Sequence, residues 1–126
     1  MTRSAVVLDD APETRTMIAK SLRAAGFEVL EATNGEKALE LAQSHAPDLI
    51  IANPLMAGMD SDEFALALSV DPVFAKTPVV FSAAAEHARE VRCLAQGCNV
   101  THVLITPCGP DDIARLVAGI LGTEQR

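Results

Sequence analysis

The chain has 126 residues and a net charge of −7 at pH 7, which suits one domain with a buried core and disfavours nucleic acid or an anionic membrane surface as a partner. Tyr and Trp are absent, so the core must be largely aliphatic. The three cysteines form no C-x-x-C pair and no signal sequence precedes them, which favours a reduced, cytoplasmic protein. No apolar run approaches the roughly 20 residues of a transmembrane helix. We expect one domain over residues 1–126, with its core over about residues 5–121.

Five short apolar runs are predicted to be strands. They lie at residues 5–8, 28–32, 49–52, 78–82 and 102–105. The run at 49–52 is apolar at consecutive positions, which indicates a strand buried on both faces, as in a parallel sheet.

Between and after these runs, apolar residues recur at helical spacing. The predicted helices cover residues 13–25, the segment after residue 35, the segments around residues 65 and 93, and a last segment that begins at Pro110. Alternating strands and helices predict a doubly wound parallel α/β sheet with right-handed crossovers. Ligand sites in such sheets lie beyond the carboxyl ends of the strands. The residues at or just past those ends are Asp9, Asp10, Asn53, Ala83 and Thr106.

Three segments, at residues 6–15, 26–39 and 47–61, resemble the response regulator receiver domain, the phosphoacceptor module of two-component signalling. They include the acidic pair Asp9-Asp10, and they follow one another in the family's order with nearly unbroken spacing. The resemblance covers nearly the whole chain. It implies a flavodoxin-like (CheY-like) fold with five parallel strands in the order 2-1-3-4-5.

The chain departs from the family at the positions that carry its chemistry. In the family, an aspartate after the third strand accepts a phosphoryl group, and a Ser or Thr and a Lys hold the phosphoryl oxygens. Here the acceptor position is Asn53, the hydroxyl position is Ala83 and the lysine position is Thr106. A carboxylate can attack phosphorus, whereas a carboxamide oxygen is a poor nucleophile. Ala57 and Ser61 depart from a usual proline and a frequent glycine of the same segment.

Neighbouring residues offer few replacements for the lost groups. Ser82 carries a hydroxyl, but successive strand residues point to opposite faces, so we expect it to point away from the site. Asp48 and Asp60 are weaker candidates for an alternative acceptor. Deamidation of Asn53 by the common route is blocked because Pro54 has no backbone N–H to attack the side chain.

Asp9, Asp10 and Asn53 form the candidate metal site that the resemblance implies. We expect weak or no Mg²⁺ binding, because a neutral carbonyl oxygen replaces one of the anionic ligands that Mg²⁺ prefers. The alternative is that Asp9 and Asp10 cap the following helix without any ion. No other cofactor is predicted.

The resemblance also places residues for switching and for partner contact. His102 takes the position of the family's switch aromatic, although a packed or surface histidine is the simpler interpretation. Arg89, Arg92 and Arg115 lie on the surface that receivers use for dimers and outputs, or form only a solvated face. The family holds the peptide bond before Pro107 in the cis form, and we expect the same here.

The leading hypothesis is a phosphorylation-independent pseudo-receiver. It would be a non-enzymatic interaction module in two-component signalling whose partner is a sensor kinase, an output domain or a second copy of the chain. One alternative is a receiver that is still phosphorylated at an atypical residue. Another is a small-ligand sensor that uses the residual acidic pocket. Met1 close to the first strand favours a genuine N-terminus.

Overall fold

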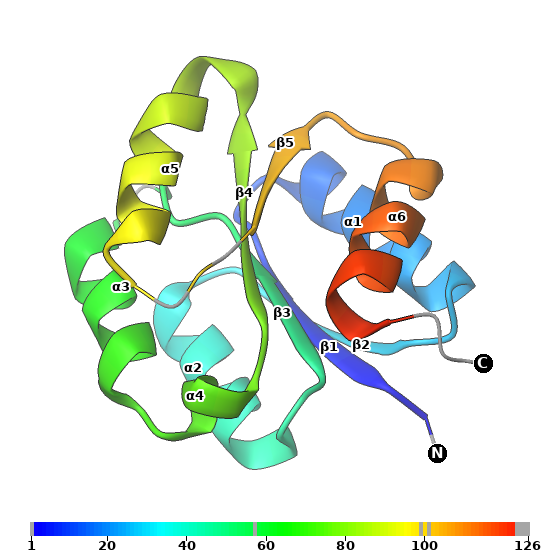
Figure 1. Cartoon of the computed structure of the whole chain (residues 1–126), viewed down its shortest axis with the longest axis horizontal. Coiled ribbons are helices and arrows are strands. Elements are labelled where there is room, and N and C mark those ends of the chain that lie inside the picture. The colour runs from blue at the N-terminus through cyan, green and yellow to red at the C-terminus, as the bar shows by residue number, and fades with distance from the viewer. Residues whose placement is uncertain (1, 57, 99, 101, 123–126) are drawn as a thin grey trace.

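The computed structural model describes residues 2–56, 58–98, 100 and 102–122, with only the backbone described at Val73. Five parallel strands form one sheet in the order β2-β1-β3-β4-β5, which confirms the predicted flavodoxin-like order (Figure 1). The strands are β1 (Ser4–Leu8), β2 (Glu28–Ala32), β3 (Leu49–Ala52), β4 (Val79–Ala84) and β5 (His102–Thr106). β4 continues two residues beyond its predicted end, so Ala83 lies within the strand and not after it.

Helices cover both faces of this sheet. They are α1 (Pro12–Ala24), α2 (Gly35–His45), α3 (Ser61–Val70), α4 (Val73–Lys76), α5 (Ala88–Gln96) and α6 (Pro110–Leu121), with a single 3₁₀ turn η1 (Ala85–His87) after β4. Figure 1 shows α1 and α6 on one face and α2, α3, α4 and α5 on the other. The five predicted helices are confirmed. The four-residue α4 and the η1 turn were not predicted.

Local chemistry explains where several helices begin. Pro12 and Pro110 start α1 and α6, where a missing N–H costs nothing because the first helical N–H groups have no partner within the helix. The Asp60 side chain accepts hydrogen bonds from the backbone N–H groups of Asp62 (3.0 Å) and Glu63 (3.1 Å), which caps α3.

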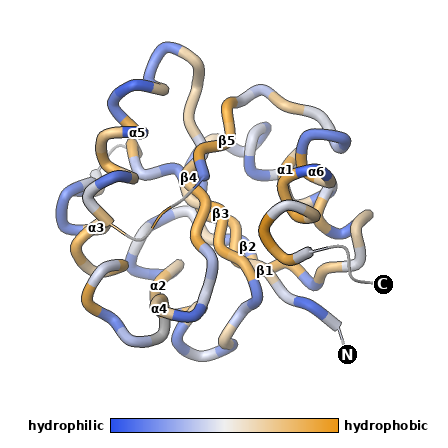
Figure 2. Tube along the Cα trace, viewed as in Figure 1, coloured by the Kyte–Doolittle hydropathy of each residue, from blue (hydrophilic) through white to orange (hydrophobic). Residues whose placement is uncertain are grey.

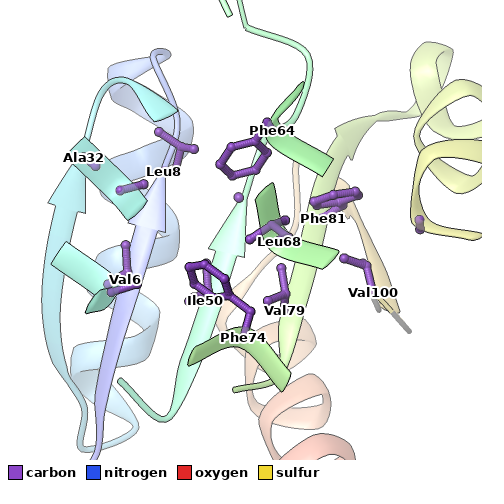
Figure 3. Packing of buried hydrophobic residues seen from close by; sticks show 14 of the residues in the cluster. Val6, Leu8, Ala32, Ile50, Phe64, Leu68, Phe74, Val79, Phe81 and Val100 are labelled. Carbon is purple, nitrogen blue, oxygen red and sulfur yellow. The ribbon is translucent and has the colours of Figure 1, made fainter. Parts of the chain in front are cut away.

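Alternation along the strands divides the core into two clusters. In β1, Val6 and Leu8 face the cluster under α2, α3, α4 and α5, whereas Val7 faces the cluster under α1 and α6. Figure 2 shows the central strands as the most hydrophobic part of the chain, and Figure 3 shows the larger cluster at close range. Every residue of β3 is buried, so the backbone that carries Asn53 is held firmly at the carboxyl end of the sheet.

Within the described residues, no helix has both the length and the apolar character that crossing a membrane requires.

Candidate functional site

The carboxyl ends of β1, β3, β4 and β5 meet around a pocket of about 190 Å³, which we call the acceptor-position pocket. Its lining consists of Asp9, Ala11, Thr14, Asn53, Leu55, Ser82, Ala83, Ala84, His87 and Thr106. The structure therefore brings together four of the five predicted site residues. The fifth, Asp10, is exposed and does not contribute to the described lining.

Asp9 is the buried acid of this pocket, with 2% of its surface exposed. Its Oδ1 accepts a hydrogen bond from the backbone N–H of Ala11 at 2.9 Å. Burial raises the pKa of Asp9 above its ordinary value, and hydrogen bonds from Ala11 and from the Asn53 side chain offset part of that rise. The negative charge of Asp10 adds to the rise, and the nearby Arg15 opposes it.

The helix-capping alternative for the acidic pair is wrong. Asp9 bonds to Ala11, which precedes the first helical residue, and no side chain caps α1. A hydrogen bond to the residue two positions ahead forms a turn within the loop and leaves the first-turn N–H groups of α1 without a cap.

Asn53 is oriented by its neighbours on both sides. Its Oδ1 accepts a hydrogen bond from the backbone N–H of Leu55 at 2.9 Å. Because the oxygen faces Leu55, the NH₂ group is the part of the carboxamide that lies toward Asp9 and lowers its pKa. The Asn53 backbone N–H donates to the carbonyl of Leu8 at 2.9 Å, which ties the end of β3 to β1.

An ion-pair network that the sequence analysis missed supports the Asp9 loop. Arg15 donates from Nη1 to the backbone carbonyl of Asp9 at 2.9 Å and from Nε to Glu31 Oε1 at 3.1 Å. Arg23 donates to the other oxygen of Glu31 at 3.2 Å. The spacing of these residues gives no signal, because the contacts run from helix α1 to strand β2.

Ser82 contributes to the pocket although its side chain and that of Ala83 lie on opposite faces of the sheet. It lies on the opposite sheet face from Ala83, as strand alternation predicts, yet both residues contribute to the pocket wall. Ser82 is 2% exposed, and its hydroxyl makes no hydrogen bond within the described part of the chain. Ser82 contributes to the wall because the pocket extends across the end of the sheet.

Thr106 ends β5, is half-buried and lines the pocket, and the cis peptide bond before Pro107 is confirmed. Thr14 and His87 also line the pocket, and neither was predicted from the sequence. His87 belongs to the η1 turn and lies 4.0 Å from the Glu90 carboxylate. The sequence does not show where β4 ends, so it could not place His87 at the site.

The other named residues lie elsewhere. Asp48 accepts from the Ser4 backbone N–H at 2.8 Å at the amino end of the sheet, and Asp60 caps α3. Neither belongs to the acceptor-position pocket, and residue 57 lies outside the described residues. Among the described residues, no group of three or more His, Cys, Asp or Glu is arranged to hold a metal ion.

The predicted partner residues are spread over three elements. Arg89 and Arg92 lie on α5 and line separate surface hollows. Arg115 lies on α6, where its Nη2 donates to Asp112 Oδ1 at 2.7 Å. His102 is exposed at the start of β5, paired in register with Val80.

The sequence is similar to those of several response regulators. The chain is 30% identical over 124 residues to the response regulator Rre1 of Synechocystis sp., covering 97% of this chain and 53% of that protein. It is 30% identical over 118 residues to the phosphate regulon transcriptional regulatory protein PhoB of Pseudomonas aeruginosa, covering 92% and 51%. It also matches the two-component response regulator ORR11 of Oryza sativa subsp. indica with 30% identity, covering 92% and 79%. The chain therefore spans about half the length of the first two relatives.

Solved structures share the fold. The chemotaxis response regulator CheY4 of Vibrio cholerae superposes with a TM-score of 0.83 and 26% identity, covering 94% of this chain and 98% of that one. The receiver domain of the sensor histidine kinase PA1611 from Pseudomonas aeruginosa, solved with a magnesium ion in its active-site cleft, has a TM-score of 0.84. At 17% identity, with coverage of 97% and 99%, it shows likeness of fold alone. The family model described as "Response regulator receiver domain" matches residues 5–118, and the chain belongs to that family.

Proposed function

We propose that this receiver domain acts without phosphorylation, as an interaction module in two-component signalling. The observation that carries the proposal is the orientation of Asn53, whose oxygen accepts from the Leu55 N–H at 2.9 Å while its NH₂ group lies toward Asp9 and lowers the pKa of that carboxyl. The side chain at the acceptor position is thus a hydrogen-bond donor toward the acidic loop. Forming an acyl phosphate requires a carboxylate nucleophile at this position.

The residues present do not fit Mg²⁺, the ion that the family implies. Mg²⁺ prefers anionic oxygens in near-octahedral geometry. The Asn53 oxygen is bonded to Leu55, and its NH₂ group presents hydrogens to Asp9. One Asp9 oxygen accepts from Ala11, and Asp10 is exposed outside the pocket lining. The carboxamide NH₂ partly offsets the negative charge of Asp9, so a group of the protein itself, and not an ion, stabilises the carboxylate.

The phosphoryl-binding groups are also missing from the pocket walls. Ala83 cannot hydrogen-bond a phosphoryl oxygen, and Thr106 supplies no positive charge. With no covalent switch, regulation has to come from partner binding, from the amount of the protein or from another ligand. The proposed partners, met in the cytoplasm, are a sensor kinase, an output domain or a second copy of the chain. Arg89, Arg92 and Arg115 are proposed contact residues.

Phosphorylation at an atypical residue is the competing function, and the position of Ser82 in the pocket wall is the observation in its favour. Its low exposure argues against it, because a donor must approach the hydroxyl in line. The small-ligand alternative for the same pocket is limited by its volume of about 190 Å³, below the range of roughly 300–1,000 Å³ of typical ligand sites.

Intact-mass measurement after incubation with acetyl phosphate and Mg²⁺ tests the proposal. The wild-type chain should gain no phosphoryl group. A positive control is the triple variant Asn53→Asp, Ala83→Thr, Thr106→Lys, which restores the family's residues and should gain one. A phosphoryl group on the wild-type chain, mapped by fragmentation to Ser82 or to an aspartate, would contradict the proposal.

A further inference from the structure

A second pocket, separate from the acceptor-position pocket, lies between the start of α2 and the start of α3. We call it the α2–α3 pocket. Its volume is about 490 Å³, within the range of roughly 300–1,000 Å³ in which proteins hold small organic ligands. It shares no described lining residue with the acceptor-position pocket. Its lining includes Gly35, Glu36, Met56, Met59, Glu63 and Phe64.

The apolar part of this lining belongs to the packed core. Met56 and Phe64 are 7% and 5% exposed, and the Phe64 ring lies 6.5 Å from the Phe81 ring, centroid to centroid (Figure 3). Met59 packs so closely on Gly35 that a Cβ there would lie 2.7 Å from the methionine sulfur. Methionine and phenylalanine adapt well to flat apolar ligands.

The polar part of the lining is acidic. Glu36 and Glu63 are exposed residues of the first turns of α2 and α3, and Asp60 is exposed beside them. Within the described lining there is no Lys, Arg or His. Neither Glu36 nor Glu63 has an ion-pair partner among the described residues. Three carboxylates with no cationic side chain in the described lining favour a positively charged ligand group.

Anions are disfavoured for a further reason. The N-terminus of a helix can bind an anion through its free backbone N–H groups. In α2, however, Asn34 Oδ1 accepts from the Lys37 N–H at 2.8 Å, and in α3 Asp60 accepts from the N–H groups of Asp62 and Glu63. The helix dipoles account for acidic residues in these first turns. The same positions place the carboxylates at the pocket.

We infer that the α2–α3 pocket binds a free organic cation that combines an apolar body with one ammonium or guanidinium group. The body lies on Met56, Met59 and Phe64, and the charged group lies at Glu36 and Glu63. The inference goes beyond the proposed function, because it uses none of the residues of the acceptor-position pocket.

Three probes of similar size test it on the ¹⁵N-labelled chain: phenethylamine, phenethyl alcohol and 3-phenylpropanoate. Amide NMR titrations should show saturable shifts at Gly35, Met59 and Phe64 with the amine. The amine should bind roughly tenfold or more tightly than the alcohol, the effect of one charge-assisted hydrogen bond. The carboxylate should bind most weakly.

Matched variants separate a specific site from general charge attraction. Glu36→Gln with Glu63→Gln should lower the affinity for the amine to that for the alcohol and leave the alcohol unchanged. The control is Glu13→Gln with Asp111→Asn, which removes the same charge from the first turns of α1 and α6 on the opposite face of the sheet. The control should keep the wild-type preference for the amine.

Equal affinities for the three probes, or equal losses in the two double variants, would overturn the inference. An acetylated and amidated peptide that contains phenylalanine next to arginine carries one positive charge, as phenethylamine does. If it binds at least roughly tenfold more tightly than phenethylamine, the inference is also overturned, because a partner's peptide segment would then be the better occupant. Loss of amine binding leaves the intact-mass result with acetyl phosphate unaffected, so failure here is distinguishable from failure of the proposed function.

Discussion

The Asn53 NH₂ group lies toward the buried Asp9 carboxylate and lowers its pKa, while Asn53 Oδ1 accepts a hydrogen bond from the Leu55 backbone N–H at 2.9 Å. The two ends of the carboxamide therefore contact Asp9 and Leu55 at once, and each of these residues would lose its contact if the side chain turned. This relationship makes the acceptor position a structural element of the domain and supplies the first prediction.

Asn53→Asp should lower the stability of the metal-free protein at neutral pH. The substitution replaces a donor with a second anion beside a buried carboxylate, and losing the hydrogen bond alone costs about 1–3 kcal/mol. Added Mg²⁺ should recover part of the loss, because the variant regains an anionic ligand. Thermal unfolding with and without Mg²⁺ measures both effects. Asn53→Ala, which removes the donor without adding charge, should be destabilised but insensitive to Mg²⁺.

Ser82→Ala should leave the free energy of unfolding unchanged or raise it by up to about 1 kcal/mol. The hydroxyl is buried and unbonded within the described residues, so the folded protein bears its desolvation cost. Urea denaturation followed by circular dichroism measures the change. A loss of more than about 1 kcal/mol would show that the hydroxyl has a partner in the folded protein.

Asp112 should make the stability of the domain depend on pH. Its Oδ2 accepts from the Gly109 N–H at 2.8 Å, and this bond, with the contact to Arg115, holds the pKa of Asp112 below its ordinary value. Because the pKa of Asp112 is lower in the folded than in the unfolded protein, the ionised side chain stabilises the folded state at pH values above the unfolded-state pKa. This stabilisation is lost as the pH falls through the folded-state pKa. Asp112→Asn should therefore be less stable than wild type at pH 7, and the difference should shrink in acid.

Urea denaturation at several pH values checks the Asp112 prediction, with Asp111→Asn as the control. Asp111 occupies the same first turn of α6 and makes no hydrogen bond within the described residues. Its substitution should have a smaller effect at pH 7. A difference between Asp112→Asn and wild type that stays constant from neutral to acidic pH would contradict the assigned role.

Two leucines of α3 should respond differently to truncation. Leu68 is 2% exposed and packs in the larger core cluster, whereas Leu66 is 61% exposed. Leu68→Ala should cost about 2–5 kcal/mol, the range for buried leucines. Leu66→Ala should change stability by less than about 0.5 kcal/mol, as for most surface positions. Equal losses in denaturation experiments would show that the outer face of α3 is covered in solution.

Much of the fold could be predicted because its signals are local. The consecutive apolar residues of β3 indicate a parallel sheet, and Pro110 marks the start of α6. The end of β4 was misplaced because residues 82–85 are all small and contain no turn signal. The four-residue α4 is too short to show helical periodicity.

The site could be predicted as a set of positions but not as an arrangement of atoms. That Asp9 and Asn53 lie together follows from strand order alone. The orientation of the Asn53 carboxamide depends on the Leu55 N–H, and the contribution of Ser82 depends on how the pocket extends across the sheet. The α2–α3 pocket is lined by side chains from two helices, and the spacing of residues along the sequence does not show how those helices pack.

The most direct test of phosphorylation independence is an amide NMR titration of the labelled chain with Mg²⁺ and then with beryllofluoride, a mimic of the phosphoryl group. We predict no saturable shifts at the amides of Asp10, Asn53, Ala83 and Thr106. The Asn53→Asp, Ala83→Thr, Thr106→Lys variant should respond under the same conditions. Saturable shifts in the wild-type chain that spread from Asn53 to α5 and β5 would contradict the account.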